Sequence, residues 1–223
     1  MFTYLLFIAP ALILGLWAQM RVKATYAQAQ RIAAPLSGAA VARHILDSAG
    51  LHDVAIEQVP GHLSDHYDPR HKVLRLSPEV YGSRSLAAVG IAAHEAGHAL
   101  QDARQYIPLV VRNAAVPAAS FGSGASFLLL ILGMIFQFAP LVFLGIGLFG
   151  CVVFFQLVNL PVEFNASSQA KQQLVALGVV NSQELVYVDK VLSAAAWTYV
   201  AATLQALMTL LYYVMIFTGG SRD

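Results

Sequence analysis

Four long apolar runs constrain this 223-residue chain more than any other feature of its sequence. None of them contains Lys, Arg, Asp or Glu, and they cover residues 2–20, 116–138, 141–160 and 192–217. A helix needs about 20 mainly apolar residues to cross a bilayer. Only 11% of the residues are charged, against about 25% in soluble domains. The sequence therefore predicts an integral membrane protein with about four transmembrane helices.

The first and last runs need separate arguments. No basic residue precedes the first run, and Arg21 and Lys23 follow it, which favours an uncleaved anchor over a signal peptide. The last run is interrupted by Thr198, Gln205 and Thr209. A fourth span is the preferred interpretation there, and an amphipathic helix packed on the polar domain is the alternative.

The positive charges predict a topology. Ten of the 13 Lys and Arg residues fall between Arg21 and Arg112, and Lys171 and Lys190 lie in the second polar segment. Four spans place both polar segments on one side, and positive charge marks the cytoplasmic side. The net charge of +1 gives no reason to expect a nucleic-acid partner. The single cysteine, Cys151, excludes an intramolecular disulfide.

The first polar segment reads as a small α+β region. Apolar residues at helical spacing predict a helix over 39–49, ending at Gly50. Alternation predicts a strand over 54–59, and two hairpin strands over 63–67 and 72–76. Ser77-Pro78 starts the next helix. We expect a mainly helical α+β membrane protein with a small antiparallel sheet.

One motif in this segment carries chemistry. His94-Glu95-Ala96-Gly97-His98 reads H-E-x-x-H, and on a helix its two histidines share one face. Two imidazoles at that spacing can share one Zn²⁺, with Glu95 as general base for a water molecule. Ser85 and the surrounding alanines favour the helix. A helix with two surface histidines is the alternative.

A third ligand is expected from the second polar segment. Glu163 is the only carboxylate between Asp102 and Glu184, and it directly follows the central apolar hairpin, which returns the chain to the side of His94. As a ligand it would complete a His₂Glu site with an open position. A solvated interfacial glutamate is the alternative.

Beyond the motif, the sequence resembles the membrane-bound neutral zinc metallopeptidases of the YugP type, and more distantly the HtpX and CAAX-prenyl-protease peptidases. The resemblance covers nearly the whole chain. It rests on the H-E-x-x-H stretch through Gln101, on 61–70 (GHLSDHYDPR), on 73–77 with Val80-Tyr81, and on 161–167 (PVEFNAS).

The resemblance implies a gluzincin-like domain with His94, His98 and Glu163 as zinc ligands and Glu95 as catalytic base. Related peptidases place an aspartate four residues after the ligand glutamate, where this chain has Ser167. Asn165, Ser167 or a backbone carbonyl is therefore the expected partner that orients His94.

These inferences combine into one hypothesis, a zinc metalloendopeptidase in a bacterial plasma membrane with a cytoplasmic active site. His66, or Tyr67, is expected to stabilise the oxyanion, and the strand over 63–67 to hold an extended peptide. Expected partners are a protein or peptide substrate, the bilayer, and a second copy or another membrane protein. A non-catalytic zinc-binding scaffold is the alternative, and a transporter is disfavoured because the spans carry no charge.

The expected layout alternates membrane and cytoplasmic segments. The membrane segments are an anchor at 1–20, a hairpin at 116–160 and a fourth transmembrane or membrane-associated helix at 191–218. The cytoplasmic segments are the zinc peptidase region at 21–115 and the third-ligand helix at 161–190.

Overall fold

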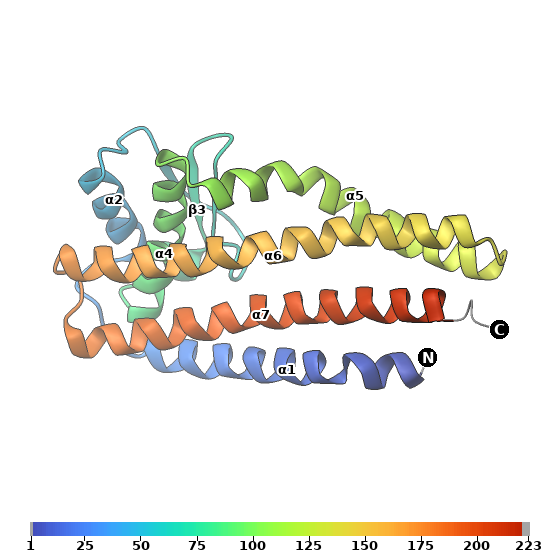
Figure 1. Ribbon diagram of the computed structural model, residues 1–223. Helices are drawn as coiled ribbons and strands as arrows, with labels where there is room; N and C mark the ends of the chain where they lie inside the picture. Colours follow the sequence, from blue (N-terminus) through green and yellow to red (C-terminus); the bar gives the residue numbers. More distant parts are fainter. Residues whose placement is uncertain (1, 220–223) are drawn as a thin grey trace. The chain divides into compact units, whose positions relative to one another are not determined.

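The computed structural model describes residues 2–219 and is mainly helical (Figure 1). The elements follow in the order α1 (Phe2–Gln30), α2 (Gly38–Ser48), β1 (Ala55–Gln58), β2 (His66–Asp68), β3 (Val73–Leu76), α3 (Pro78–Tyr81), α4 (Leu86–Ala103), α5 (Ile107–Ile135), α6 (Ala139–Ala176) and α7 (Ser182–Gly219). Of these described residues, 2–17, 108–161 and 198–219 form one compact unit, and 18–107 with 162–197 form a second.

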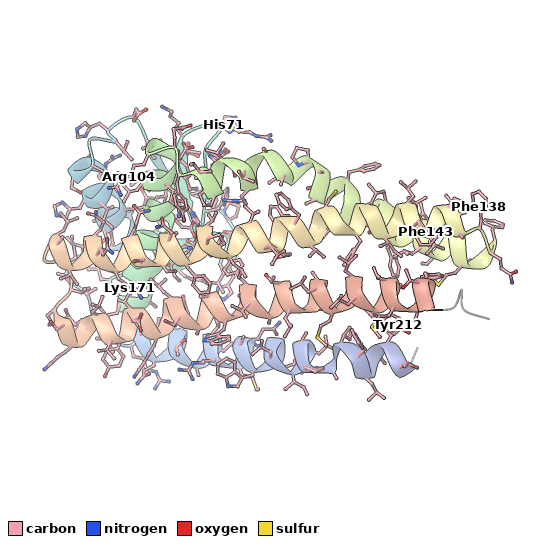
Figure 2. The ribbon with its side chains drawn as sticks, viewed as in Figure 1. His71, Arg104, Phe138, Phe143, Lys171 and Tyr212 are labelled. Atoms are coloured by element: carbon pink, nitrogen blue, oxygen red, sulfur yellow. The ribbon has the colours of Figure 1, made fainter. Side chains whose placement is uncertain are left out.

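Four helices are long and apolar enough to cross a membrane, which confirms the predicted number of spans among the described residues. They are Thr3–Gln30, Ile107–Ile135, Ala139–Ala176 and Ser182–Thr218. Large apolar side chains on them and in the turn between α5 and α6 are exposed, among them Phe143 of α6 and Phe138 of the turn (Figure 2). This exposure suits a lipid environment, since soluble proteins rarely leave so much apolar surface uncovered.

Two helix boundaries differ from the prediction. The first helix extends beyond the predicted anchor at 1–20, because α1 continues to Gln30 and no glycine or proline interrupts it after Gly15. The turn of the central hairpin lies at 136–138 rather than at Ala139-Pro140. Proline is tolerated in the first turn of a helix, where an N–H has no intrahelical partner, so Pro140 sits inside α6.

Small residues allow close helix packing in the first unit. A Cβ atom added at Gly122 of α5 would lie 2.7 Å from the carbonyl oxygen of Leu148 in α6. Ser126, one turn later on α5, is 1% exposed. The lack of a side chain at Gly122 thus lets the backbones of α5 and α6 approach closely, as in other membrane helix pairs.

The second unit holds the sheet and the helix of the H-E-x-x-H motif. α2 packs against α4, and Val41, Ile45 and Leu86 are fully buried between the elements of this unit. The strand order is β1-β3-β2. β2 and β3 pair antiparallel as predicted, but β1 runs parallel to β3, so the expectation of a wholly antiparallel sheet is wrong.

The physical reason for this order lies in β3. Val73, Leu74 and Leu76 are at most 3% exposed. β3 is the central strand of the sheet and has a neighbouring strand on each side. The chain leaving β1 passes through β2 first and then returns as β3 in the direction of β1, which is the longer connection that a parallel pair requires.

The single helix expected over 161–190 is instead the end of α6 and the start of α7. Gly178, with φ of 64°, lies in the break, since glycine adopts this conformation without strain. The Asn181 side chain accepts from the backbone N–H groups of Gln183 and Glu184, and the Glu184 carboxylate accepts from the Asn181 N–H. This reciprocal cap begins α7.

Candidate metal centre

The two histidines of the motif lie one turn apart on α4. The Ser85 hydroxyl accepts the backbone N–H of Ala88 at 3.2 Å and begins the helix, as predicted. The ring centroids of His94 and His98 are 4.9 Å apart and the rings are nearly perpendicular. Their side chains are 14% and 10% exposed, so both are held within the domain.

α6 brings a carboxylate to the same place. Oε2 of Glu163 lies 3.3 Å from Nε2 of His94 and 3.7 Å from Nε2 of His98. One ligand atom from each residue falls within 4.8 Å of the other two, and the Glu163 side chain is 8% exposed. Within the described residues this is the one His, Cys, Asp and Glu group found to be suited to a metal ion.

Gly97 permits this meeting of α4 and α6. A Cβ atom at this position would lie 2.8 Å from the carbonyl oxygen of Ala166, which is closer than any side chain tolerates. The backbone of α4 therefore touches that of α6 between the two histidines and the carboxylate. This gives the glycine inside the motif a packing role.

The orienting partner of His94 is Ser167. The Ser167 hydroxyl lies 3.1 Å from Nδ1 of His94, one turn beyond Glu163 on α6. Of the three partners that the sequence allowed, the structure selects this hydroxyl. When Nδ1–H donates to the hydroxyl oxygen, the lone pair of Nε2 is available for a metal ion beside Glu163.

His98 has a partner that the sequence reasoning did not assign. Nδ1 of His98 lies 2.9 Å from Oε1 of Gln101, while Nε2 of Gln101 donates to the carbonyl oxygen of Val162 at 2.8 Å. A backbone carbonyl only accepts, so the Gln101 amide nitrogen must face it and the amide oxygen must face His98. Nδ1 of His98 therefore carries the proton, and Nε2 is the free ligand atom.

This contact belongs to a chain of neutral amides joining α4 to α6. Oδ1 of Asn165 accepts from Nε2 of Gln101 at 2.9 Å and from Nε2 of Gln169 at 2.7 Å. Arg104 donates to Oε1 of Gln169 at 3.0 Å. Arginine can only donate, so the orientation of every amide is fixed from both ends. The polar spacing at 101, 165 and 169 was visible in the sequence, but only the helix pairing shows that these residues meet.

Glu95 lies between the histidines on α4 and is partly exposed. Its carboxylate makes no hydrogen bond or ion pair with another residue in the described part of the chain. Burial lowers the pKa of His98, but the nearby carboxylates of Glu163 and Glu95 outweigh it, and the net shift is upward. Glu95 is thus close enough to His98 to affect its charge.

The two oxyanion candidates lie on β2, which packs against α4. The Tyr67 hydroxyl donates to Oδ2 of Asp102 at 3.0 Å, and burial together with this bond raises the pKa of Tyr67. His66 is exposed, with Nδ1 2.8 Å from the carbonyl oxygen of Ser64. The proton of Tyr67 is engaged elsewhere, whereas Nε2 of His66 stays open, and its role remains a prediction.

The donor set fits zinc. Two imidazole nitrogens with their lone pairs turned inward and one carboxylate are the ligands of a catalytic His₂Glu site, which leaves a fourth position open. The Gln101 oxygen holds the ring of His98 in the required tautomer, and the Ser167 hydroxyl is able to accept from Nδ1 of His94 in the same way.

Comparison with known proteins agrees with this chemistry. The family described as "Putative neutral zinc metallopeptidase" matches residues 4–218. The chain is 50% identical, over 215 residues, to the "Putative membrane protease YugP" of Bacillus subtilis (strain 168), covering 96% of this chain and 95% of that protein. No solved structure matches. With nearly its whole length matched, the chain is a membrane protein that belongs to this neutral zinc metallopeptidase family.

Proposed function

We propose that the protein is a zinc-dependent endopeptidase that hydrolyses peptide bonds at the cytoplasmic face of a bacterial plasma membrane. The observation that carries this proposal is the convergence of His94, His98 and Glu163, with the carboxylate of Glu95 close enough to influence His98. Family membership and the name of the Bacillus relative support it.

Each residue of the site has a distinct role in the proposed reaction. His94, His98 and Glu163 would hold Zn²⁺, which when bound supplies a Lewis acid for the scissile carbonyl. Glu95 takes a proton from the attacking water and later gives it to the leaving amine. Ser167 and Gln101 hold the two imidazoles in the tautomer that turns Nε2 inward.

Substrate binding is assigned to β2. With the order β1-β3-β2, one side of β2 has no neighbouring strand in the sheet. An extended peptide can pair with such an edge through its backbone, which gives broad sequence specificity. We place His66 on this strand as the group that stabilises the oxyanion.

The membrane arrangement is also a proposal. We assign 1–20, 116–160 and 191–218 to the membrane, and 21–115 and 161–190 to the cytoplasm. The distribution of Lys and Arg supports this, because ten of the 13 lie between Arg21 and Arg112.

The test is Glu95→Gln. The full-length variant and the wild type are purified in detergent, their zinc content is measured by atomic absorption, and cleavage of an unfolded protein is followed. We expect equal zinc content and loss of cleavage by at least about 100-fold. A variant that keeps both zinc and activity would show that Glu95 is not the base, and a wild type that binds zinc without cleaving would favour a scaffold.

A further inference from the structure

The first unit contains a cavity that the proposed peptidase chemistry does not use. Its volume is about 390 Å³, within the size range of small-ligand sites. Side chains from α1, α5, α6 and α7 line it, and none of them is charged. Its polar lining includes Ser126, Gln156, Gln205, Tyr4 and Thr209. It is thus an uncharged cavity with both polar and apolar side chains, among helices that are long and apolar enough to span a membrane.

Three side-chain polar groups of this cavity have no hydrogen-bond partner within the described residues. The Ser126 side chain is 1% exposed, and its hydroxyl has no hydrogen bond. The side-chain amides of Gln156 and Gln205 likewise make no hydrogen bond with any residue among 2–219. By contrast, the hydroxyls of Tyr4 and Thr209 pair at 3.2 Å. Unpaired polar groups are costly in hydrocarbon, so the first three groups point to a ligand that satisfies them.

Their chemistry selects the ligand. Each glutamine amide offers both a donor and an acceptor, so a ligand that also offers both can satisfy it alone. A peptide group does this with its N–H and C=O, whereas the ester carbonyl of a lipid only accepts. The absence of charge in the lining argues for a neutral ligand. Inside an intact helix the peptide groups are already paired, so the ligand must be an uncoiled stretch of chain.

We propose that this cavity binds an uncoiled stretch of a membrane-embedded polypeptide substrate, with the amides of Gln156 and Gln205 pairing its peptide groups and the Ser126 hydroxyl adding a third bond. This proposal rests on the proposed peptidase function and deepens it, because it names membrane proteins with interrupted helices as the substrate class.

The experiment measures binding separately from cleavage. Full-length Glu95→Gln protein in phosphatidylcholine nanodiscs is mixed with an apolar Leu/Ala peptide of about 22 residues, which carries a central Gly-Pro-Gly and a photoreactive leucine beside it. A matched peptide lacks the Gly-Pro-Gly. Cross-links are mapped by mass spectrometry on this protein and on the same protein carrying Gln156→Met with Gln205→Met. The matched control is Ser120→Ala, at an exposed serine of α5 outside the cavity.

We expect the interrupted peptide to label the cavity helices at least about fivefold more than the uninterrupted one, because its peptide groups are free. Methionine is similar in size to glutamine but has no amide group. The two Met substitutions should therefore lower this labelling about tenfold, and Ser120→Ala should leave it unchanged. Equal labelling by both peptides, or labelling that survives the Met substitutions, would overturn the proposal.

Further measurements separate peptide binding from lipid binding and from loss of folding. A photoreactive diacylglycerol that labels the cavity and displaces the peptide would assign the cavity to lipid and overturn the proposal. Because Gln205 is exposed, its substitution should not disturb folding. The labelling of Gln205→Met alone is therefore measured if the double variant does not fold. Wild type is tested in parallel for cleavage of an unfolded protein. Cleavage without peptide binding refutes the cavity proposal alone, and peptide binding without any cleavage refutes the peptidase function alone.

Discussion

The amide oxygen of Gln101 lies 2.9 Å from Nδ1 of His98, and the amide nitrogen of the same residue is held by a backbone carbonyl of α6. The tautomer of a candidate metal ligand is therefore set by the packing of two helices. This relationship makes the ligand geometry depend on residues that never touch the metal position.

Gln101→Met should weaken zinc binding about 10- to 100-fold, the usual cost of losing a hydrogen-bond partner of a ligand. The substitution preserves side-chain size but removes the acceptor that holds the Nδ1 proton of His98. Zinc affinity is measured by competition with a chelator, with circular dichroism to verify folding. Gln172→Met, at an exposed position of α6, is the control and should bind zinc as the wild type does. Unchanged affinity in Gln101→Met would mean that His98 orients itself.

Ser167→Ala should lower zinc affinity by roughly tenfold, because Nδ1 of His94 loses its acceptor at 3.1 Å. Ser168→Ala serves as the matched control, since the Ser168 hydroxyl contacts Gln172 rather than the site. Chelator competition again gives the measurement. If both variants bind zinc equally well, a water molecule or another group orients His94.

Gly97→Ala should both destabilise the protein and loosen the site. The new methyl group would meet the Ala166 carbonyl at 2.8 Å, and such overpacking costs about 1–3 kcal/mol. Because α6 must move away from α4, Glu163 would move away from the histidines. Thermal unfolding and zinc affinity are both measured. Gly82→Ala, where a Cβ atom meets nothing within 4 Å, should change neither, and a Gly97→Ala protein with wild-type zinc affinity would contradict the close-contact argument.

The Asp68 carboxylate should make stability depend on pH. The hydrogen bond from His71, opposed by partial burial and reinforced by Arg75, holds the pKa of Asp68 below its ordinary value. A group with a lowered folded pKa stabilises the fold above its unfolded pKa of about 4 and loses that contribution as the pH falls toward the folded value.

The prediction is that Asp68→Asn lowers the melting temperature at pH 7, and that the difference from wild type shrinks as the pH is lowered from about 5 to 3. Asp53→Asn is the control, because Asp53 forms an exposed pair with Lys72 and exposed pairs contribute little. A difference that stays constant over this pH range would show that the ionisation of Asp68 contributes no stability.

The sequence predicted much of the fold because its strongest signals were local. Apolar run length gave the four candidate spans, and Ser85 with the alanines that follow gave the start of α4. The parallel pairing of β1 with β3 was missed because strand order depends on which strand the core buries, and periodicity within each strand does not contain that information.

For the site, the spacing of His94 and His98 on α4 follows from helix geometry alone, and the position of Glu163 after the central hairpin favoured it as a partner. The structure brings these three residues together. The partners of the histidines could not be ranked, because Ser167 and Gln101 meet them only through the contact of α4 with α6 at Gly97. Assigning Ser167 and Gln101 to the two histidines requires knowing how closely α4 and α6 pack, which the order of residues does not show.

The neutral partners of the two histidines also have an electrostatic consequence. Ser167 and Gln101 replace the carboxylates that often orient metal-bound imidazoles, and the amide chain through Asn165 and Gln169 adds no charge. The protein thus contributes two negative charges at the centre, one from Glu163 and one from Glu95. A divalent cation held there would be balanced by these two carboxylates, and a proton passed from water to Glu95 would leave the total charge of the centre unchanged.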